Sequence, residues 1–295
     1  MSFNFDAALL KKLSSMTLRA RYVAEGTLSG LHKSPLRGSS LEFAQHRQYV
    51  PGDELKHLDW KVYGRSDRFY IKQYQEETNL RCYSAVDTSA SMGYSSNGVS
   101  KLEYASYLAA ALTYLLVQQN DSAGLITYRD SIDRFIPPRS FRAHMQYVMD
   151  NLEDLRAQGR TDILSVASEI GRRIKKRSLL IIFSDLYENP GELVKAFKYF
   201  PYLRNDLIVF HILDPEELHL NQRGDVDYVD METGEALRTV PEVIRKEYLS
   251  QMKAFLEDIE KGLRAHKVDY YRISTDTPLD AALSTFIEGR KRLLL

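Results

Sequence analysis

Hydrophobic positions from about residue 75 onward alternate between short, nearly continuous apolar runs and longer stretches with helical spacing. This alternation is typical of βαβ units that build a mostly parallel sheet with helices on both faces. The short runs predict strands at 80–87, 121–130, 133–138, 178–185, 207–215 and 268–275. The longer stretches predict helices at 101–120, 141–155, 163–177, 191–206, 241–266 and 278–293. The predicted fold class is therefore α/β, doubly wound.

Two of these strands, 121–130 and 133–138, are separated by a very short connection. Because a parallel crossover needs a dozen or more residues, they are expected to form an antiparallel pair at a sheet edge. The run at 178–185, "SLLIIFSD", is apolar almost throughout and indicates a central strand buried on both faces. Pro241 is well placed to open the helix at 241–266.

The first 75 residues do not show this alternation of strand-like and helix-like stretches. A helical stretch near residues 5–26 is followed by a loop rich in glycine, serine and proline at 26–40, and then by mixed short strands and polar turns. We expect an N-terminal extension at 1–75, joined by a flexible loop, and a main domain at 76–295. Aspartates and glycines at about 215–240 predict a small β excursion within the main domain.

Charge and cysteine usage narrow the functional class. Lys plus Arg and Asp plus Glu each number 40, so the chain has no net charge to attract nucleic acid or an anionic membrane. No apolar run approaches the roughly 18–20 residues that span a bilayer, and no signal peptide is predicted. The one cysteine, Cys82, lies in an apolar run and indicates a buried side chain. The expected compartment is the cytoplasm.

Polar side chains gather at the predicted strand ends. Asp87, Ser89 and Ser91 follow the strand at 80–87, Asp185 ends the strand at 178–185, and Thr161 precedes a helix. The carboxyl ends of parallel strands form the rim where ligands bind in doubly wound folds. Carboxylates and hydroxyls are hard oxygen ligands that suit Mg²⁺ or Mn²⁺. Hydroxyls add no charge, so such an ion stays electrophilic and can take an outside carboxylate at an open position.

These residues carry a first resemblance. The D-x-S-x-S pattern at Asp87, Ser89 and Ser91, with Thr161 and Asp185, resembles the metal-ion-dependent adhesion site of von Willebrand factor A domains. In that family the two serines and the threonine contact the ion directly or nearly so, and the aspartates often act through water. A glutamate or aspartate of a partner protein completes the shell. The resemblance implies a metal-dependent protein-binding module.

A second resemblance covers nearly the whole chain. The stretch 41–77 is similar to the hallmark of the bacterial domain of unknown function 58 family, which precedes a von Willebrand A-like domain. The matching residues are Glu42, Phe43, Arg47, Tyr49, Gly52, Asp53, Asp59, Trp60 and Arg65. Such proteins typically occur beside MoxR-type AAA+ ATPases, so the resemblance implies an ATPase of this type as a partner. The N-terminal membrane helices of many members are not carried over to this chain.

Other interpretations stay open at this stage. Asp87, Ser89 and Ser91, or Thr161 and Asp162, would also suit helix caps. A Mg²⁺-dependent phosphohydrolase would use Asp87 as its nucleophile and Asp185 to hold the ion. Such enzymes generally place a second aspartate two residues after the first, where this chain has Ser89, and a hydroxyl is a poor proton donor near neutral pH. A scaffold with an empty site is the third interpretation.

Overall fold

A computed structural model describes residues 7–11, 13, 15–30, 43–49, 60–66, 69–74, 80–202 and 204–293. The chain divides into two compact units, one of residues 1–33 with 80–295 and the other of residues 34–79. This division differs from the expected boundary near residue 75. The reason is that helix α2 (Met16–Gly30) packs against helix α4 (Lys101–Gln118), so the first helices join the main unit.

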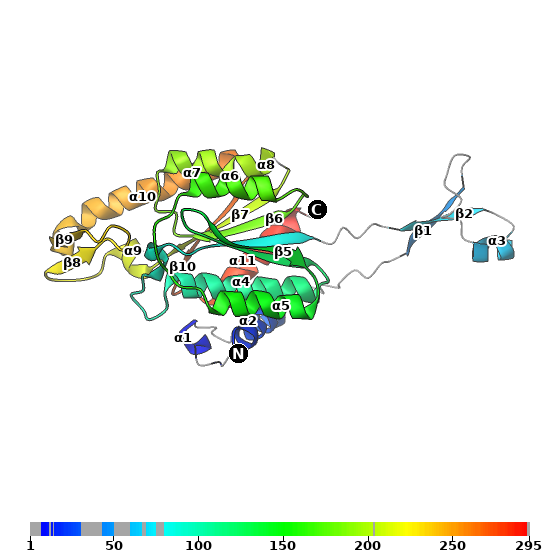
Figure 1. Ribbon diagram of the computed structural model, residues 1–295, viewed down its shortest axis with the longest axis horizontal. Helices are drawn as coiled ribbons and strands as arrows, with labels where there is room; N and C mark the ends of the chain where they lie inside the picture. Colours follow the sequence, from blue (N-terminus) through cyan, green and yellow to red (C-terminus); the bar gives the residue numbers. More distant parts are fainter. Residues whose placement is uncertain are drawn as a thin grey trace. The chain divides into compact units, whose positions relative to one another are not determined.

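The main unit is built on a six-stranded sheet with the strand order β10-β7-β6-β3-β4-β5 (Figure 1). All neighbours pair in parallel except β4 and β5, which form the predicted antiparallel pair at the edge. The expected doubly wound, mostly parallel sheet is therefore confirmed. The strands are β3 (Arg81–Asp87), β4 (Ser122–Tyr128), β5 (Ile132–Arg139), β6 (Leu179–Ser184), β7 (Asp206–Leu213) and β10 (Asp269–Ser274).

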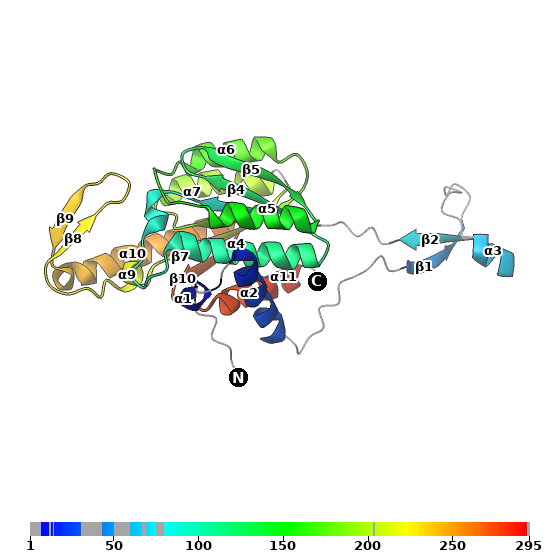
Figure 2. The same ribbon diagram turned by 60° about the horizontal axis from the view of Figure 1, so that its bottom comes forward.

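Helices cover both faces of the sheet (Figures 1 and 2). One face packs on α2, α4, α5 (Arg142–Glu153) and α11 (Leu279–Leu293), and the other on α6 (Ile163–Arg173), α7 (Pro190–Phe197), α8 (Tyr199–Tyr202) and α10 (Pro241–Ala265). Alternate residues of each strand enter the two cores, as Val86 and Ala85 of β3 do. The short helix α1 (Ala7–Leu10) adds to the first core. None of the described helices is long and apolar enough to cross a membrane.

The chain changes direction at β3, and this creates the crevice where the site lies. From β3 the chain proceeds through η2 (Ala90–Gly93) and α4 to β4, whereas β6 pairs on the other side of β3. The segments that follow β3 and β6 therefore leave toward opposite faces of the sheet. Ligands of doubly wound proteins bind at such a switch point, beyond the carboxyl ends of the strands.

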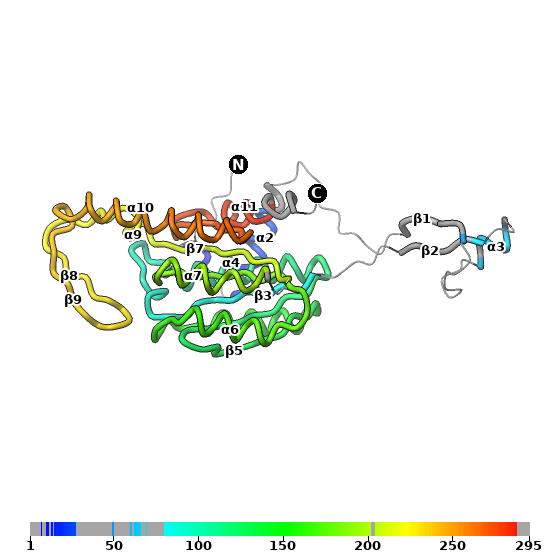
Figure 3. Tube along the Cα trace, turned by 90° about the horizontal axis from the view of Figure 1, so that it is seen from above, coloured from blue at the N-terminus to red at the C-terminus, as the bar shows by residue number. Residues whose placement is uncertain are grey.

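The predicted excursion at 215–240 is a helical turn and a hairpin. Helix α9 (Pro215–His219) is followed by β8 (Val226–Val229) and β9 (Ala236–Thr239), which pair in an antiparallel two-stranded sheet. Pro241 occupies the first turn of α10, as its position in the sequence predicts. Figure 3 shows this hairpin at one end of the main unit, next to α9 and the start of α10.

The second unit contains β1 (Phe43–Gln48) paired antiparallel with β2 (Tyr70–Tyr74), and α3 (Trp60–Ser66) between them in sequence. Tyr63 of α3 stacks on Phe69 with ring centroids 4.4 Å apart. Of the family-like motif, β1 contains Phe43 and Arg47, and α3 contains Trp60 and Arg65. Tyr49 directly follows β1. The remaining motif residues lie outside the described residues; they are Glu42, Gly52, Asp53 and Asp59.

A buried lysine joins three elements of the main unit. Lys101, the first residue of α4, has no solvent exposure, and its ammonium donates to Asp185 Oδ2 at 2.7 Å and to Glu217 Oε1 at 2.5 Å. Burial lowers the pKa of Lys101, but the charges of the two carboxylates outweigh it and raise the pKa overall. Lys101 therefore stays charged. It holds α4, the end of β6 and α9 together.

We expect Lys101→Met to lower the free energy of unfolding by about 3–5 kcal/mol, because the buried Asp185 and the half-buried Glu217 lose their counter-ion. Urea denaturation of the full chain measures this change. The matched control is Lys253→Met on α10, whose side chain is 77% exposed, and we expect no measurable shift of its midpoint. Equal midpoints for the two variants would contradict the role assigned to Lys101.

Candidate functional site

The two aspartates of the candidate site reach it from adjacent parallel strands. Asp87 is the last residue of β3, and Asp185 directly follows Ser184, the last residue of β6. Because β3 and β6 pair in parallel, both carboxylates lie at the same edge of the sheet. Both residues are almost fully buried, with 1% and 2% of their surface exposed.

Thr161 reaches the same place from a distant part of the sequence. The loop before α6 is hydrogen-bonded to the segment after β3, since the Gln158 N–H donates to the Thr88 carbonyl and the Ala90 N–H to the Gly159 carbonyl, both at 2.9 Å. Thr161 Oγ1 then lies 3.2 Å from Asp87 Oδ1 and donates to it. The structure thus brings Thr161 to Asp87, as the resemblance implied.

Asp87 is the centre of this cluster. Its Oδ2 accepts a hydrogen bond from Ser184 Oγ at 2.7 Å, and its Oδ1 accepts the Ser89 N–H at 2.9 Å in addition to Thr161. Burial, followed by the negative charge of Asp185, raises the pKa of Asp87 to about 6, although its hydrogen bonds oppose the shift. The Asp87 carboxylate is therefore fixed in orientation and stabilised by any cation that approaches it.

The two serines direct their hydroxyls toward each other. Ser89 Oγ and Ser91 Oγ are 3.1 Å apart. Ser89 precedes η2, but its side chain makes no capping hydrogen bond. The capping interpretation holds instead for Asp162, whose side chain accepts the Ser165 N–H at 3.0 Å at the start of α6. Helix capping therefore does not account for the presence of Ser89 before η2, whereas it does account for Asp162 at the start of α6.

Hydrogen bonds to both the side chain and the main chain of Asp185 fix its position. One carboxylate oxygen accepts the Lys101 ammonium, which the sequence did not indicate. Its carbonyl oxygen lies 2.7 Å from His211 Nε2, and His211 Nδ1 lies 2.7 Å from the Tyr270 hydroxyl. Burial lowers the pKa of His211 to about 4, so the ring is neutral, donates to the carbonyl and accepts from the tyrosine. Asp185 thus lines the site with one oxygen already paired.

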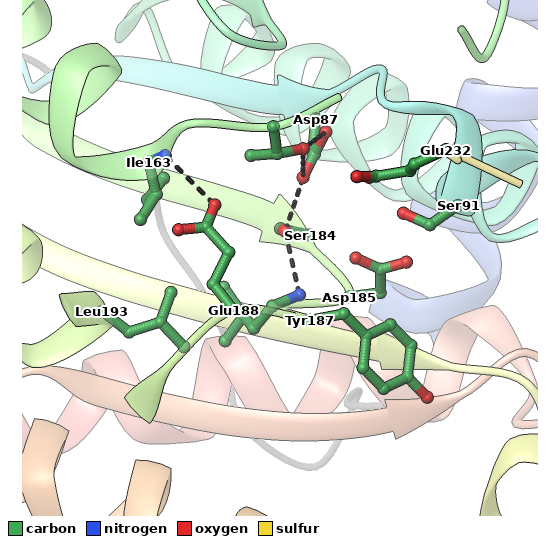
Figure 4. A pocket seen from close by; sticks show the side chains of 11 residues that line it. Asp87, Ser91, Ile163, Ser184, Asp185, Tyr187, Glu188, Leu193 and Glu232 are labelled. Atoms are coloured by element: carbon green, nitrogen blue, oxygen red, sulfur yellow. Dashed lines mark hydrogen bonds between the residues drawn. The ribbon is translucent and has the colours of Figure 1, made fainter. Parts of the chain in front are cut away.

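These groups enclose a cavity of about 90 Å³, drawn in Figure 4. It has room for an ion and bound water, since a water molecule occupies about 30 Å³ in the liquid. Its lining residues are Asp87, Ser91, Thr161, Ile163, Ser184, Asp185, Leu186, Tyr187, Glu188, Leu193 and Glu232. Four of them are acidic, and Lys101 is the cation that contacts one of the four.

Sequence reasoning missed two of the acidic residues. Glu188 Oε1 accepts the Ile163 N–H at 3.1 Å, and burial with the charge of Asp87 raises the pKa of Glu188 to about 7. Its only signal was its place three residues after Asp185. Glu232 comes from the tip of the β8–β9 hairpin, and no local pattern points from there to the site.

The donor set suits a divalent cation such as Mg²⁺ or Mn²⁺. Within the described part of the chain, no three Asp, Glu, His or Cys side chains form a cage that could hold a metal on their own. The hydroxyls of Ser89, Ser91 and Thr161, together with water, would have to complete the shell around Asp87. Hydroxyls, carboxylates and waters are ligands that Mg²⁺ accepts. A cation would also offset the repulsion between the buried carboxylates.

A curated relative matches almost the whole chain, and one solved structure shares the fold of the main unit. The uncharacterized protein Rv1480 of Mycobacterium tuberculosis is 23% identical over 291 residues, covering 97% of this chain and 91% of the relative. A solved structure of the conserved hypothetical protein BatB from Bacteroides thetaiotaomicron matches with a TM-score of 0.50 and 18% identity, covering 72% of this chain and 99% of that one. The SpRpn10 VWA domain matches with a TM-score of 0.39 and 13% identity, over 68% and 92% of the two chains.

A family model described as "Protein of unknown function DUF58" matches residues 45–256, which is more than half of the chain. The match runs from within β1 through β9 and most of α10, and so includes all five candidate residues. The resemblance of this sequence to the domain of unknown function 58 family is thereby confirmed, and the chain belongs to the DUF58 family.

Proposed function

We propose that this protein is a metal-dependent protein-binding module. Mg²⁺, or Mn²⁺ in its place, is held by Asp87, Ser89, Ser91, Thr161 and Asp185, and a glutamate or aspartate of a partner protein fills its open position. The observation that carries the proposal is that hydroxyls from two distant segments meet at the buried Asp87 carboxylate. Thr161 donates to Asp87, Ser91 lines the same cavity, and Ser89 Oγ lies 3.1 Å from Ser91 Oγ.

The neutral hydroxyl ligands of the proposed ion, rather than the acidic lining of the cavity, favour an acidic partner. Lys101 already offsets part of the charge of Asp185, and the hydroxyl ligands carry none. A bound divalent cation therefore keeps much of its positive charge and attracts a carboxylate from outside. The cavity is small, about 90 Å³, so one extended acidic side chain suits it better than a large ligand.

The same geometry favours binding over catalysis. Both oxygens of Asp87 accept hydrogen bonds, from Ser184, Ser89 and Thr161, and this lowers the nucleophilicity that a phosphohydrolase would need. Ser89, in the place of the expected acid-base aspartate, has its hydroxyl directed toward Ser91. No observation in the described residues favours the phosphohydrolase, and we propose a non-enzymatic module.

The proposed partner is a MoxR-type AAA+ ATPase, or a client protein on which such an ATPase acts, in the cytoplasm. Support for this partner comes from the family resemblance alone. The chemical requirement is an exposed aspartate or glutamate on the partner. No nucleic acid or membrane contact is part of the proposal.

Calorimetric titration with Mn²⁺ or Mg²⁺ tests the metal site. At pH 8, above the pKa of about 6 of Asp87, we expect binding to the wild type. Asp87→Asn should weaken binding by about tenfold or more, on the scale of losses seen when groups around a metal are removed. Thr161→Val, which removes only the hydroxyl, should weaken it less, and the exposed Ser165→Ala on α6 should bind like the wild type. Unchanged affinity in Asp87→Asn would contradict the site.

Pull-down of a purified MoxR-type ATPase from the same organism tests the partner. We expect capture by the wild type in Mg²⁺, loss of capture in EDTA, recovery when Mg²⁺ is restored, and no capture by Asp87→Asn. Replacing exposed aspartates and glutamates of the ATPase by their amides should then identify one carboxylate that is required. Capture that persists in EDTA would show that the ion does not mediate this contact.

A further inference from the structure

The hairpin of β8 and β9 ends in a turn that is rigidly hydrogen-bonded. Asp230 Oδ1 accepts the N–H groups of Glu232 at 2.7 Å and of Thr233 at 2.8 Å, and the Gly234 N–H donates to the Asp230 carbonyl at 2.8 Å. Gly234 has φ +75°, which closes the turn without strain. The turn therefore presents the Glu232 side chain in a defined direction.

That direction is toward the candidate metal site. Glu232 lines the same cavity as Asp87, Ser91, Thr161 and Asp185, and Figure 4 shows its carboxylate turned into this cavity. The neighbouring Met231 packs against the segment after β3, since a Cβ added at Gly93 would lie 3.4 Å from the Met231 methyl carbon. The tip of the hairpin thus lies beside the site, with Glu232 in the lining of the cavity and Met231 close to Gly93.

The environment of Glu232 is unfavourable for its charge when no cation is present. Burial, followed by the negative charges of Asp185 and Asp230, raises the pKa of Glu232, and Arg160 opposes this only in part. A divalent ion in the cavity would remove this cost. Glu235, three residues further in the same turn, is exposed and does not line the cavity.

The base of the excursion is held firmly, whereas its strands are not. Arg245 of α10 donates to the carbonyls of Leu220 at 2.8 Å and Gln222 at 3.2 Å, and the Gly224 N–H donates to Glu242. Beyond Gly224, with φ +78°, most residues of β8 and β9 are exposed. Segments with few buried contacts open at low free energy, so the hairpin is able to swing about this base.

We propose that Glu232 closes onto the cation as an internal ligand when the ion binds, and that it then occupies the position of a partner's carboxylate until the partner displaces the hairpin. Without the ion, Asp87, Asp185 and Glu232 line the same cavity but do not form a three-carboxylate cage. This inference rests on the proposed function and adds a gate to the same site. A partner then binds only if its acidic residue competes with Glu232. Removing Glu232 should lower the affinity of the site for the ion. It should also leave one coordination position of the ion free for carboxylates from outside.

Mn²⁺ titrations followed by water proton relaxation test this, because they report both affinity and the number of exchangeable waters on the ion. The full chain would be measured as wild type, Glu232→Ala, the matched control Glu235→Ala and Asp87→Asn. N-acetylglutamate serves as the probe for a partner carboxylate. Urea denaturation of each variant checks that the fold is intact.

In Glu232→Ala we expect Mn²⁺ affinity to fall by about tenfold, the scale seen when groups around a metal are lost. The relaxation enhancement of bound Mn²⁺ should rise, because water replaces the carboxylate. N-acetylglutamate should reduce this enhancement at lower concentration than in the wild type. Glu235→Ala should match the wild type in all three measurements.

A second readout follows the hairpin itself. Arg238 of β9 has a side chain that is 70% exposed and is a trypsin site within the hairpin. Mn²⁺ should slow cleavage at Arg238 in the wild type and in Glu235→Ala, and it should have no such effect in Glu232→Ala.

Two results would overturn the inference in distinguishable ways. If Glu232→Ala matches Glu235→Ala in affinity, relaxation and cleavage while Asp87→Asn loses Mn²⁺, Glu232 is no ligand and the proposed function still stands. If the wild type does not bind Mn²⁺, with or without N-acetylglutamate, the proposed function fails and the inference fails with it.

Discussion

Burial of two carboxylates in one crevice is the constraint on which the rest of this site depends. Asp87 and Asp185 end neighbouring parallel strands and are almost fully buried at the switch point of the sheet. Buried carboxylates are unfavourable unless they are hydrogen-bonded or paired with a cation. The protein meets this demand differently for each, with three hydrogen-bond donors at Asp87 and the Lys101 ammonium at Asp185.

This difference assigns different tasks to the two residues. Lys101 fixes Asp185 and links it through Glu217 to α9, the element from which the hairpin leaves. Asp87 has hydroxyl neighbours in place of a fixed cation, so its surroundings are suited to an exchangeable one. The fold thus contains one permanent cation, Lys101, and the proposed function assigns the groups around Asp87 to a second. Glu188 and Glu232 add charge to the same cavity and strengthen the demand for that second ion.

The fold was largely predictable because its signals are local. Apolar runs such as "SLLIIFSD" and the short link between β4 and β5 report strand burial and direction within a few residues. The candidate site residues could be named from the sequence for the same reason, since they lie at or soon after the end of a strand or just before a helix. That they hold a cation stays a prediction. Lys101 and Glu232 were missed because only tertiary packing brings them to Asp185 and to the cavity, and the place of Glu188 three residues after Asp185 was too weak a signal. The first helices were placed in the extension because the packing of α2 on α4 leaves no local signal.

The central claim is that a cation binds among Asp87, Ser89, Ser91 and Thr161, and anomalous diffraction from Mn²⁺-soaked crystals of the full chain tests it most directly. The account predicts one strong anomalous peak in the cavity lined by Asp87, Ser91 and Thr161, next to Ser89, and no peak in crystals of Asp87→Asn. An empty cavity in well-diffracting, Mn²⁺-saturated wild-type crystals, or a peak that persists in Asp87→Asn, would contradict it.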